Sequence, residues 1–146
     1  MEEIQSAVRS LALEKFSAYV SDVFDYTLPF KEFGMRLIRF AKEEPDIFHM
    51  LFLDRETCIN EIPPVLAECL KNLKQSFSMS ESQLSVLFRQ ILTFTCGIAI
   101  LARQTPEKYT DELISEMLTI QFSSTMSFLK SGCEIKTSTP CQTPSR

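Results

Sequence analysis

Several residue types on which small enzymes depend are scarce in this sequence: its 146 residues include no tryptophan, one histidine and three glycines. So few glycines disfavour a β-sandwich or a loop-rich fold and favour long helices. With one histidine, no Cys-x-x-Cys pair and no glycine-rich phosphate loop, nucleophilic, zinc-dependent and phosphate-transfer chemistry have no evident carrier. The sequence therefore predicts a protein that is not an enzyme and that uses neither a metal nor another cofactor.

Signals for export and for membrane insertion are also lacking. The five cysteines are odd in number and show no paired spacing, which favours a reducing compartment. Glu2 and Glu3 stand where a secretory signal needs basic residues. The most apolar run, residues 91–102, is broken by Thr and Gly and falls short of the roughly 20 residues that cross a bilayer. These features predict a soluble, cytoplasmic protein.

The balance of charge argues against binding of nucleic acid by this chain alone. The net charge is −4, and the lysines and arginines are scattered along the sequence. Affinity for nucleic acid comes largely from neutralising phosphates with a basic face. No such cluster is denser here than the one around Lys71 and Lys74.

Hydrophobic periodicity and helix stop signals predict an all-α fold of six helices. Ser80 and Gln83 fit a capping box, and Gly132 fits a left-handed helix stop. The helices are expected over residues 2–26, 29–43 and 46–53, from just after Asn60 to Phe77, over 81–103, and from Thr110 or Asp111 to Lys130. Residues 1–131 form one domain in this interpretation, and residues 132–146 form a disordered tail.

The last two predicted helices each carry two apolar stripes. On the fifth helix the inner stripe consists of Leu84, Leu87, Phe88, Ile91, Thr95, Ile98, Ala99 and Ala102, and the second of Val86, Gln90, Phe94, Gly97 and Leu101. On the sixth, one stripe consists of Leu113, Met117, Ile120, Ser124 and Phe128, and the next of Leu118, Phe122, Thr125 and Leu129. An apolar arc this wide must be covered on two sides.

Two arrangements provide that cover. These helices are either the centre of a monomeric bundle, or they pack with a second copy into an intermolecular four-helix bundle, with Gly97 and Ser124 allowing close approach. In the homodimer, the second stripe of each helix, namely Val86, Gln90, Phe94, Gly97, Leu101, Leu118, Phe122, Thr125 and Leu129, is the predicted interface.

Two segments resemble the effector-binding domain of TetR-type transcriptional regulators. In residues 33–52, Phe40-Ala41 is followed by three polar residues, Pro45, Phe48 and Leu51-Phe52, a pattern that is typical of the second and third helices of that domain. In residues 94–99, Gly97 is followed by Ile98 and Ala99, as where the penultimate helix of such regulators meets its partner. Many members carry His before this glycine, whereas this chain has Cys96, which puts a His-dependent ligand contact in doubt.

The resemblance implies a homodimer that binds a small apolar or amphipathic effector inside the domain. The implied ligand-binding residues are Tyr19, Phe33, Met35, Leu37, His49, Phe52, Leu66, Cys69, Phe88 and Thr95. Each also has a purely structural interpretation: Thr95, for example, could bond to its own helix, and His49 could be half exposed. The three-helix DNA-binding module of the family is not in this sequence, so operator DNA would be reached only through such a module. The alternative function is a helical interaction module that binds no ligand.

Overall fold

A computed structural model describes residues 1–54 and 64–132 of the chain, and within these ranges it contains six α-helices and no strand. The helices are α1 (Glu2–Tyr19), α2 (Pro29–Glu43), α3 (Pro45–Phe52), α4 (Pro64–Phe77), α5 (Glu81–Gln104) and α6 (Asp111–Lys130), with a 3-10 turn, η1 (Val23–Asp25), between α1 and α2. The predicted all-α fold class is confirmed. The segment after Asn60, where the fourth helix was expected to begin, and the predicted tail lie outside the described residues.

Local signals at the helix ends behave as the sequence predicted. The backbone N–H of Gln83 donates to Ser80 Oγ at 3.2 Å, and the N–H of Ser80 donates to Gln83 Oε1 at 3.0 Å, which completes the capping box of α5. Thr110 Oγ1 accepts the N–H of Leu113 at the start of α6. Gly132, just after α6, has a φ of 73°, a backbone conformation that glycine adopts without strain.

The first helix ends earlier than the periodicity predicted. A helix to Tyr26 was expected, but α1 stops at Tyr19. In a continuing helix the carbonyl of Tyr19 would accept the N–H of Val23; instead it accepts a hydrogen bond from Arg36 Nη1 at 3.0 Å, and the N–H of Val23 donates to Val20. The side chain of Arg36 therefore helps to turn the chain into η1, and the prediction of helix over residues 20–26 was wrong.

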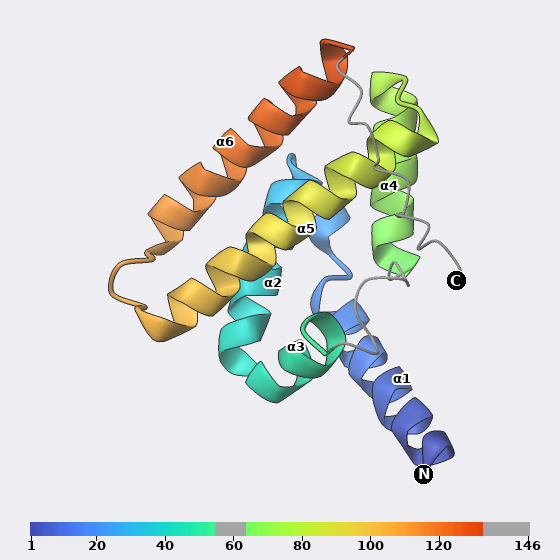
Figure 1. The fold of residues 1–146 in the computed structure, drawn as a ribbon, viewed down its shortest axis with the longest axis vertical. Coiled ribbons are helices and arrows are strands. Elements are labelled where there is room, and N and C mark those ends of the chain that lie inside the picture. Colours follow the sequence, from blue (N-terminus) through green and yellow to red (C-terminus); the bar gives the residue numbers. More distant parts are fainter. Residues whose placement is uncertain (55–63, 133–146) are drawn as a thin grey trace, which may run out of the picture.

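α5 lies across α2 at the centre of the molecule (Figure 1). α6 runs antiparallel to α5 along one edge, α4 lies beside the first half of α5, and α1 and α3 lie around the other end of α2. The long helices α2 and α5 share the main hydrophobic core, to which the other helices add side chains.

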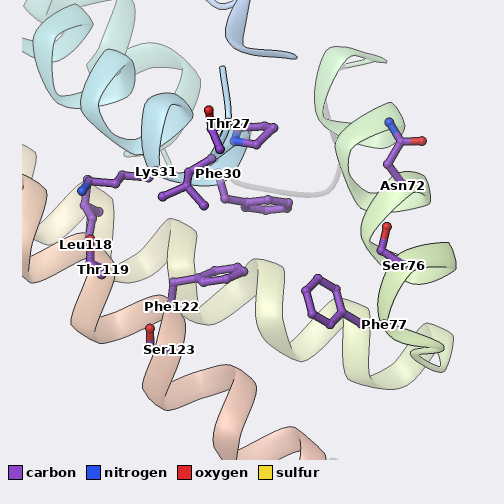
Figure 2. A pocket seen from close by; sticks show the side chains of 12 residues that line it. Thr27, Phe30, Lys31, Asn72, Ser76, Phe77, Leu118, Thr119, Phe122 and Ser123 are labelled. Atoms are coloured by element: carbon purple, nitrogen blue, oxygen red, sulfur yellow. The ribbon is translucent and has the colours of Figure 1, made fainter. Parts of the chain in front are cut away.

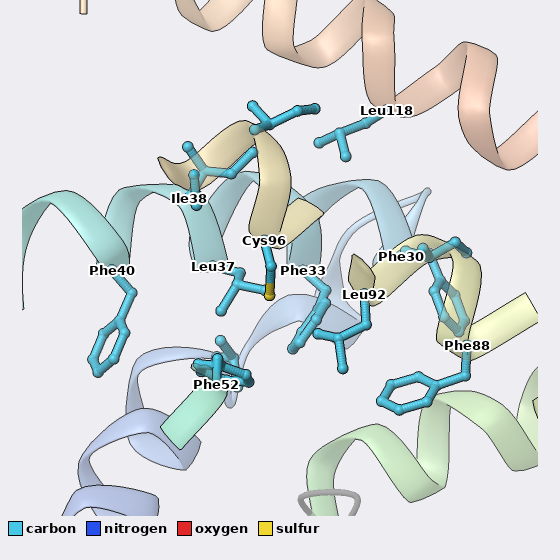
Figure 3. Close-up of a cluster of buried hydrophobic side chains, with 14 of the residues drawn as sticks. Phe30, Phe33, Leu37, Ile38, Phe40, Phe52, Phe88, Leu92, Cys96 and Leu118 are labelled. Carbon is cyan, nitrogen blue, oxygen red and sulfur yellow. The ribbon is translucent and has the colours of Figure 1, made fainter. Parts of the chain in front are cut away.

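Aromatic rings fill the part of the core between α1, α2 and α3. Phe16 of α1 makes edge-to-face contacts with Phe33, Phe40 and Phe52, with ring centroids 6.1, 5.2 and 5.1 Å away. Figure 3 shows Phe33 and Leu37 of α2 pointing toward the same interior as Leu92 and Cys96 of α5. These ring contacts join α1, α2 and α3.

A glycine sets the distance between α2 and α6. A Cβ built on Gly34 would lie 2.9 Å from a methyl carbon of Leu118, closer than side chains tolerate. The absence of a side chain at Gly34 therefore allows Leu118 to pack directly onto the backbone of α2. This contact brings the middle of α6 against the first half of α2.

The first half of α1 extends away from the rest of the fold (Figure 1). Ile4, Val8 and Leu11 recur on one side of this half, and all three are exposed. The first buried residue of the helix is Ala12, after which Phe16 and Val20 are also buried. Only the second half of α1 is anchored in the core.

α5 is the single helix in the described part of the chain that is long and apolar enough to cross a membrane. Within the fold, 44% of its most apolar stretch is buried. Its inner face packs on α2.

Candidate functional site

A cavity of about 460 Å³ lies between the start of α2, the second half of α4 and the middle of α6. Its lining residues are Thr27, Leu28, Pro29, Phe30, Lys31, Asn72, Ser76, Phe77, Leu118, Thr119, Phe122 and Ser123. The volume falls within the range of small-molecule binding sites, roughly 300–1,000 Å³. Figure 2 shows the rings of Phe30, Phe77 and Phe122 around it, contributed by three different helices.

Contacts between helices hold the aromatic walls in place. The rings of Phe30 and Phe122 are stacked, with centroids 5.9 Å apart and an angle of 28° between their planes. Lys130, at the end of α6, places its ammonium group 5.0 Å from the centroid of Phe77. Gln83 Nε2 donates to the carbonyl of Leu129 at 3.2 Å, which ties the start of α5 to the end of α6. The cavity is thus bounded by helices that are fixed to one another.

Arg36 organises the chain just before the cavity. Its Nε donates to Glu32 Oε1 at 3.0 Å, its Nη2 donates to Asp22 Oδ2 at 2.9 Å, and its guanidinium lies 5.7 Å from the centroid of the Tyr26 ring. The hydrogen bonds to Glu32 and then to Asp22 raise the pKa of Arg36 above its usual range, so the charge is permanent. These contacts fix Tyr26, and Thr27 follows it into the cavity wall.

The cavity wall is mostly apolar and carries charge of one sign. Lys31 is its single charged lining residue, and the lining includes no Asp or Glu. The remaining polar groups are the hydroxyls of Thr27, Ser76, Thr119 and Ser123 and the amide of Asn72. None of the described residues that line it resembles a nucleophile–base pair, and no group of three or more metal-ligating side chains occurs within residues 1–54 and 64–132.

The structure places the predicted ligand-binding residues away from this cavity. Phe33, Leu37, Phe52, Phe88 and Thr95 are buried in the packed core. Thr95 Oγ1 donates to the carbonyl of Ile91 at 2.7 Å, so its polar group is satisfied within its own helix. These five residues are part of the buried core, and none of them lines the cavity.

The other predicted ligand contacts lie elsewhere. His49 is exposed, and Met35 is half-buried beside the core. Tyr19 Oη donates to Glu43 Oε2 at 2.9 Å; burial, followed by this hydrogen bond and the negative charge of Glu43, raises the pKa of Tyr19 to about 12. Leu66 and Cys69 belong to the backbone of α4, but their side chains lie outside the described residues.

On α5, the two stripes face the two directions that the periodicity indicated. All eight residues of the predicted inner stripe are buried. In the second stripe, Gln90 and Leu101 are exposed, and Val86, Phe94 and Gly97 are half-buried. A Cβ built on Gly97 would meet no atom within 4 Å, so this part of α5 faces open space in the single chain.

On α6 the two stripes are exchanged relative to the prediction. Leu118, Thr125 and Leu129, predicted to face a second copy, are buried within the chain, and Phe122 lines the cavity. The exposed apolar residues are instead Leu113, Ile120 and Phe128, which are 39%, 59% and 42% exposed. The spacing located both stripes, but it did not indicate which one packs on α2.

Comparison with known proteins adds no identification. No protein-family model, curated protein or solved structure matches the chain. Functional inference therefore depends on the cavity and on the exposed apolar surface of α5 and α6.

Sequence reasoning did not find the cavity, although it named several of the elements around it. The helix predicted over residues 29–43 includes Phe30 and Lys31, and the helix predicted to begin at Thr110 or Asp111 includes Phe122. The cavity exists because α2, α4 and α6 meet there, and these helices are distant in sequence. A cluster of Ser and Thr on one flank of α6, at Thr119 and Ser123, was the one local signal that this flank is not plain core.

Proposed function

We propose that this protein is a dimeric, small-molecule-binding helical domain of the kind found in TetR-type regulators, acting in the cytoplasm and without enzymatic activity. The observation that carries the proposal is the cavity between α2, α4 and α6. Its volume, its aromatic walls and its few polar groups are those of a site for an apolar or amphipathic effector. DNA binding by this acidic chain alone is not part of the proposal.

The exposed apolar residues of α5 and α6 support the second part of the proposal, homodimerisation. Leu101 on α5 and Leu113, Ile120 and Phe128 on α6 leave large apolar side chains in water. These four residues and the open surface over Gly97 are here called the outer face, which we propose a second copy covers. Covering apolar area in this way contributes about 25 cal/mol per Å² before the entropy of association is subtracted.

The geometry of α6 suggests how the two properties are coupled. At about 100° per residue, the cavity-lining flank (Leu118, Thr119, Phe122 and Ser123) lies roughly half a turn from Leu113, Ile120 and Phe128. One helix therefore touches the effector on one flank and the second copy on the other. A ligand that binds one position of α6 better than another would change the dimer by the same free-energy difference.

Blocking the cavity tests the proposal directly. Ser123 is exposed and lines the cavity, so Ser123→Trp fills space without removing a core side chain. Ser85 of α5 is also exposed but does not line the cavity and lies outside the outer face, which makes Ser85→Trp the matched control. A panel of alkyl alcohols, fatty acids and aromatic compounds is then screened by thermal unfolding against the wild type and both variants.

We expect some of these compounds to raise the unfolding temperature of the wild type and of the control variant Ser85→Trp, but not that of Ser123→Trp. A ligand at 100 times its Kd contributes about 2.7 kcal/mol of stability, which such an assay resolves easily. If no compound stabilises the wild type, the ligand-binding function is refuted. An interaction module that binds another protein through the outer face then becomes the better explanation.

A further inference from the structure

The cavity has an uncompensated positive charge in its wall. Lys31 is half-buried there, and within residues 1–54 and 64–132 its ammonium group has no carboxylate partner, whereas Lys15, Arg36 and Lys74 each have one. A bound anion would supply the counter-charge that this ammonium group lacks. The charge of the wall therefore selects against cationic ligands.

The backbone adds to this positive potential. Leu28 is the N-cap residue of α2 and supplies no side-chain acceptor, so the first-turn N–H groups are not capped by it. The N-terminus of a helix carries a partial positive charge that favours an anion nearby. Both Pro29 and Phe30, the first residues of α2, line the cavity. The helix end and Lys31 thus contribute charge of the same sign at the same wall.

The polar and apolar groups are separated along the cavity. Figure 2 shows the Lys31 side chain reaching toward Leu118 and Thr119 of α6, while Asn72 and Ser76 lie on the α4 side and the phenylalanine rings lie between them. Thr119 Oγ1 already donates its proton to the carbonyl of Ser115, so it offers an acceptor and no donor to a ligand. Lys31 is therefore the charged donor at the α6 end of the cavity, where the hydroxyl of Ser123 is the other donor.

We propose that the ligand of this cavity is an amphipathic carboxylate, with its carboxylate on the Lys31 ammonium and its apolar body between Phe30, Phe122 and Phe77. This inference rests on the proposed function, which supplies the cavity as a binding site, and it adds the chemical class of the ligand. A neutral ligand of the same length fills the same apolar space but leaves Lys31 without a counter-charge. We therefore expect a ligand with a carboxylate head to bind more tightly than one with a neutral head, although removing the carboxylate from water costs more free energy.

The test compares two ligands that differ only in their head group. Decanoate and decanol are titrated calorimetrically into the wild type at low ionic strength, below their aggregation limits. Lys31→Met removes the charge and keeps the aliphatic stem, and Lys31→Arg restores the charge. Lys42→Met is the matched control, since Lys42 is exposed at the other end of α2 and does not line the cavity. Ser123→Trp reports whether either ligand occupies the cavity at all.

We expect decanoate to bind the wild type about fivefold more tightly than decanol, a ratio typical of one partly screened ion pair. Lys31→Met should weaken decanoate by the same factor and leave decanol unchanged, Lys31→Arg should retain the preference, and Lys42→Met should behave as the wild type. Added salt should reduce the preference.

Two other results separate the failure of this inference from failure of the proposed function. The carboxylate assignment is overturned if both ligands bind with equal affinity, or if Lys31→Met and Lys42→Met weaken the binding of decanoate equally. In either case the binding site itself stands, provided that Ser123→Trp still blocks both ligands. If neither ligand binds the wild type, both proposals fail.

Discussion

Replacing Gly97 separates the stability of the single chain from the affinity of the proposed dimer. Gly97 lies in the middle of α5, where glycine destabilises a helix by about 1 kcal/mol relative to alanine. A Cβ at this position would meet nothing within 4 Å in the single chain, so no contact within the monomer explains the glycine. A second copy that approaches the backbone of α5 closely would explain it.

The two effects have opposite signs. Gly97→Ala should stabilise the dissociated chain by about 1 kcal/mol, which corresponds to a rise of about 3–5 °C in Tm for a domain of this size. In the dimer, each copy would place an added methyl group against its partner, and overpacking of a close contact costs about 1–3 kcal/mol. Gly97→Leu should enlarge the second effect and leave helix formation intact.

Sedimentation velocity over a concentration series, with thermal unfolding at each concentration, measures both effects. We expect the wild type to be dimeric at concentrations on the order of tens of micromolar, Gly97→Ala to dissociate at least about tenfold more readily, and Gly97→Leu to be monomeric. The matched control is Ser85→Leu, because Ser85 is exposed on α5 but lies outside the outer face. A wild type that sediments as a monomer throughout, with Gly97→Ala simply more stable, would refute the reasoning.

Two further predictions concern the single chain. Ser78 follows α4 with a φ of 51°, and the N–H of Met79 donates to the carbonyl of Lys74. Because glycine adopts this left-handed conformation without strain, Ser78→Gly should raise the free energy of unfolding in urea by up to about 1 kcal/mol, whereas the mid-helix control Ser85→Gly should lower it. A lower free energy of unfolding for Ser78→Gly would contradict the left-handed geometry. The folded-state pKa of Tyr19 is about 12 against an ordinary value of 10.0, so the stability from its neutral hydroxyl is fully present below pH 10.0 and is lost as the pH rises toward 12. Tyr19→Phe should therefore lower the unfolding free energy by about 1 kcal/mol at neutral pH, with the difference from wild type vanishing at high pH; a difference that is independent of pH would refute this account.

Features that depend on neighbours in the sequence could be predicted, and the arrangement of distant helices could not. The capping box of Ser80 and Gln83 and the stop at Gly132 involve residues a few positions apart, and both were identified correctly. The end of α1 was not, because Arg36, a residue in the next helix, accounts for the hydrogen bond at Tyr19. Periodicity along α1 carries no information about that contact.

The same distinction explains the candidate site. Helical spacing located two apolar stripes on α6, but which one faces the core depends on the missing side chain of Gly34 and the fit of Leu118 against it. The family resemblance implied ligand contacts at Phe33 and at other interior positions, yet the rings of Phe33 and Phe40 pack against Phe16 there. The cavity is the volume that α2, α4 and α6 leave unfilled between them, and the sequence of any one of these helices does not determine that volume.

The partial anchoring of α1 divides the helix into two regimes of local stability. Residues 2–8 are all exposed and gain almost nothing from tertiary packing, and an isolated helix of that length is marginal in water. Their amide hydrogens should therefore exchange with solvent by fraying, at rates far above those of the turn that carries Phe16. The boundary between open and protected amides falls near Ala12, where the continuous helix seen in the fold begins to be held by its neighbours. A helix that is uniform in geometry is thus sharply graded in the free energy needed to open it.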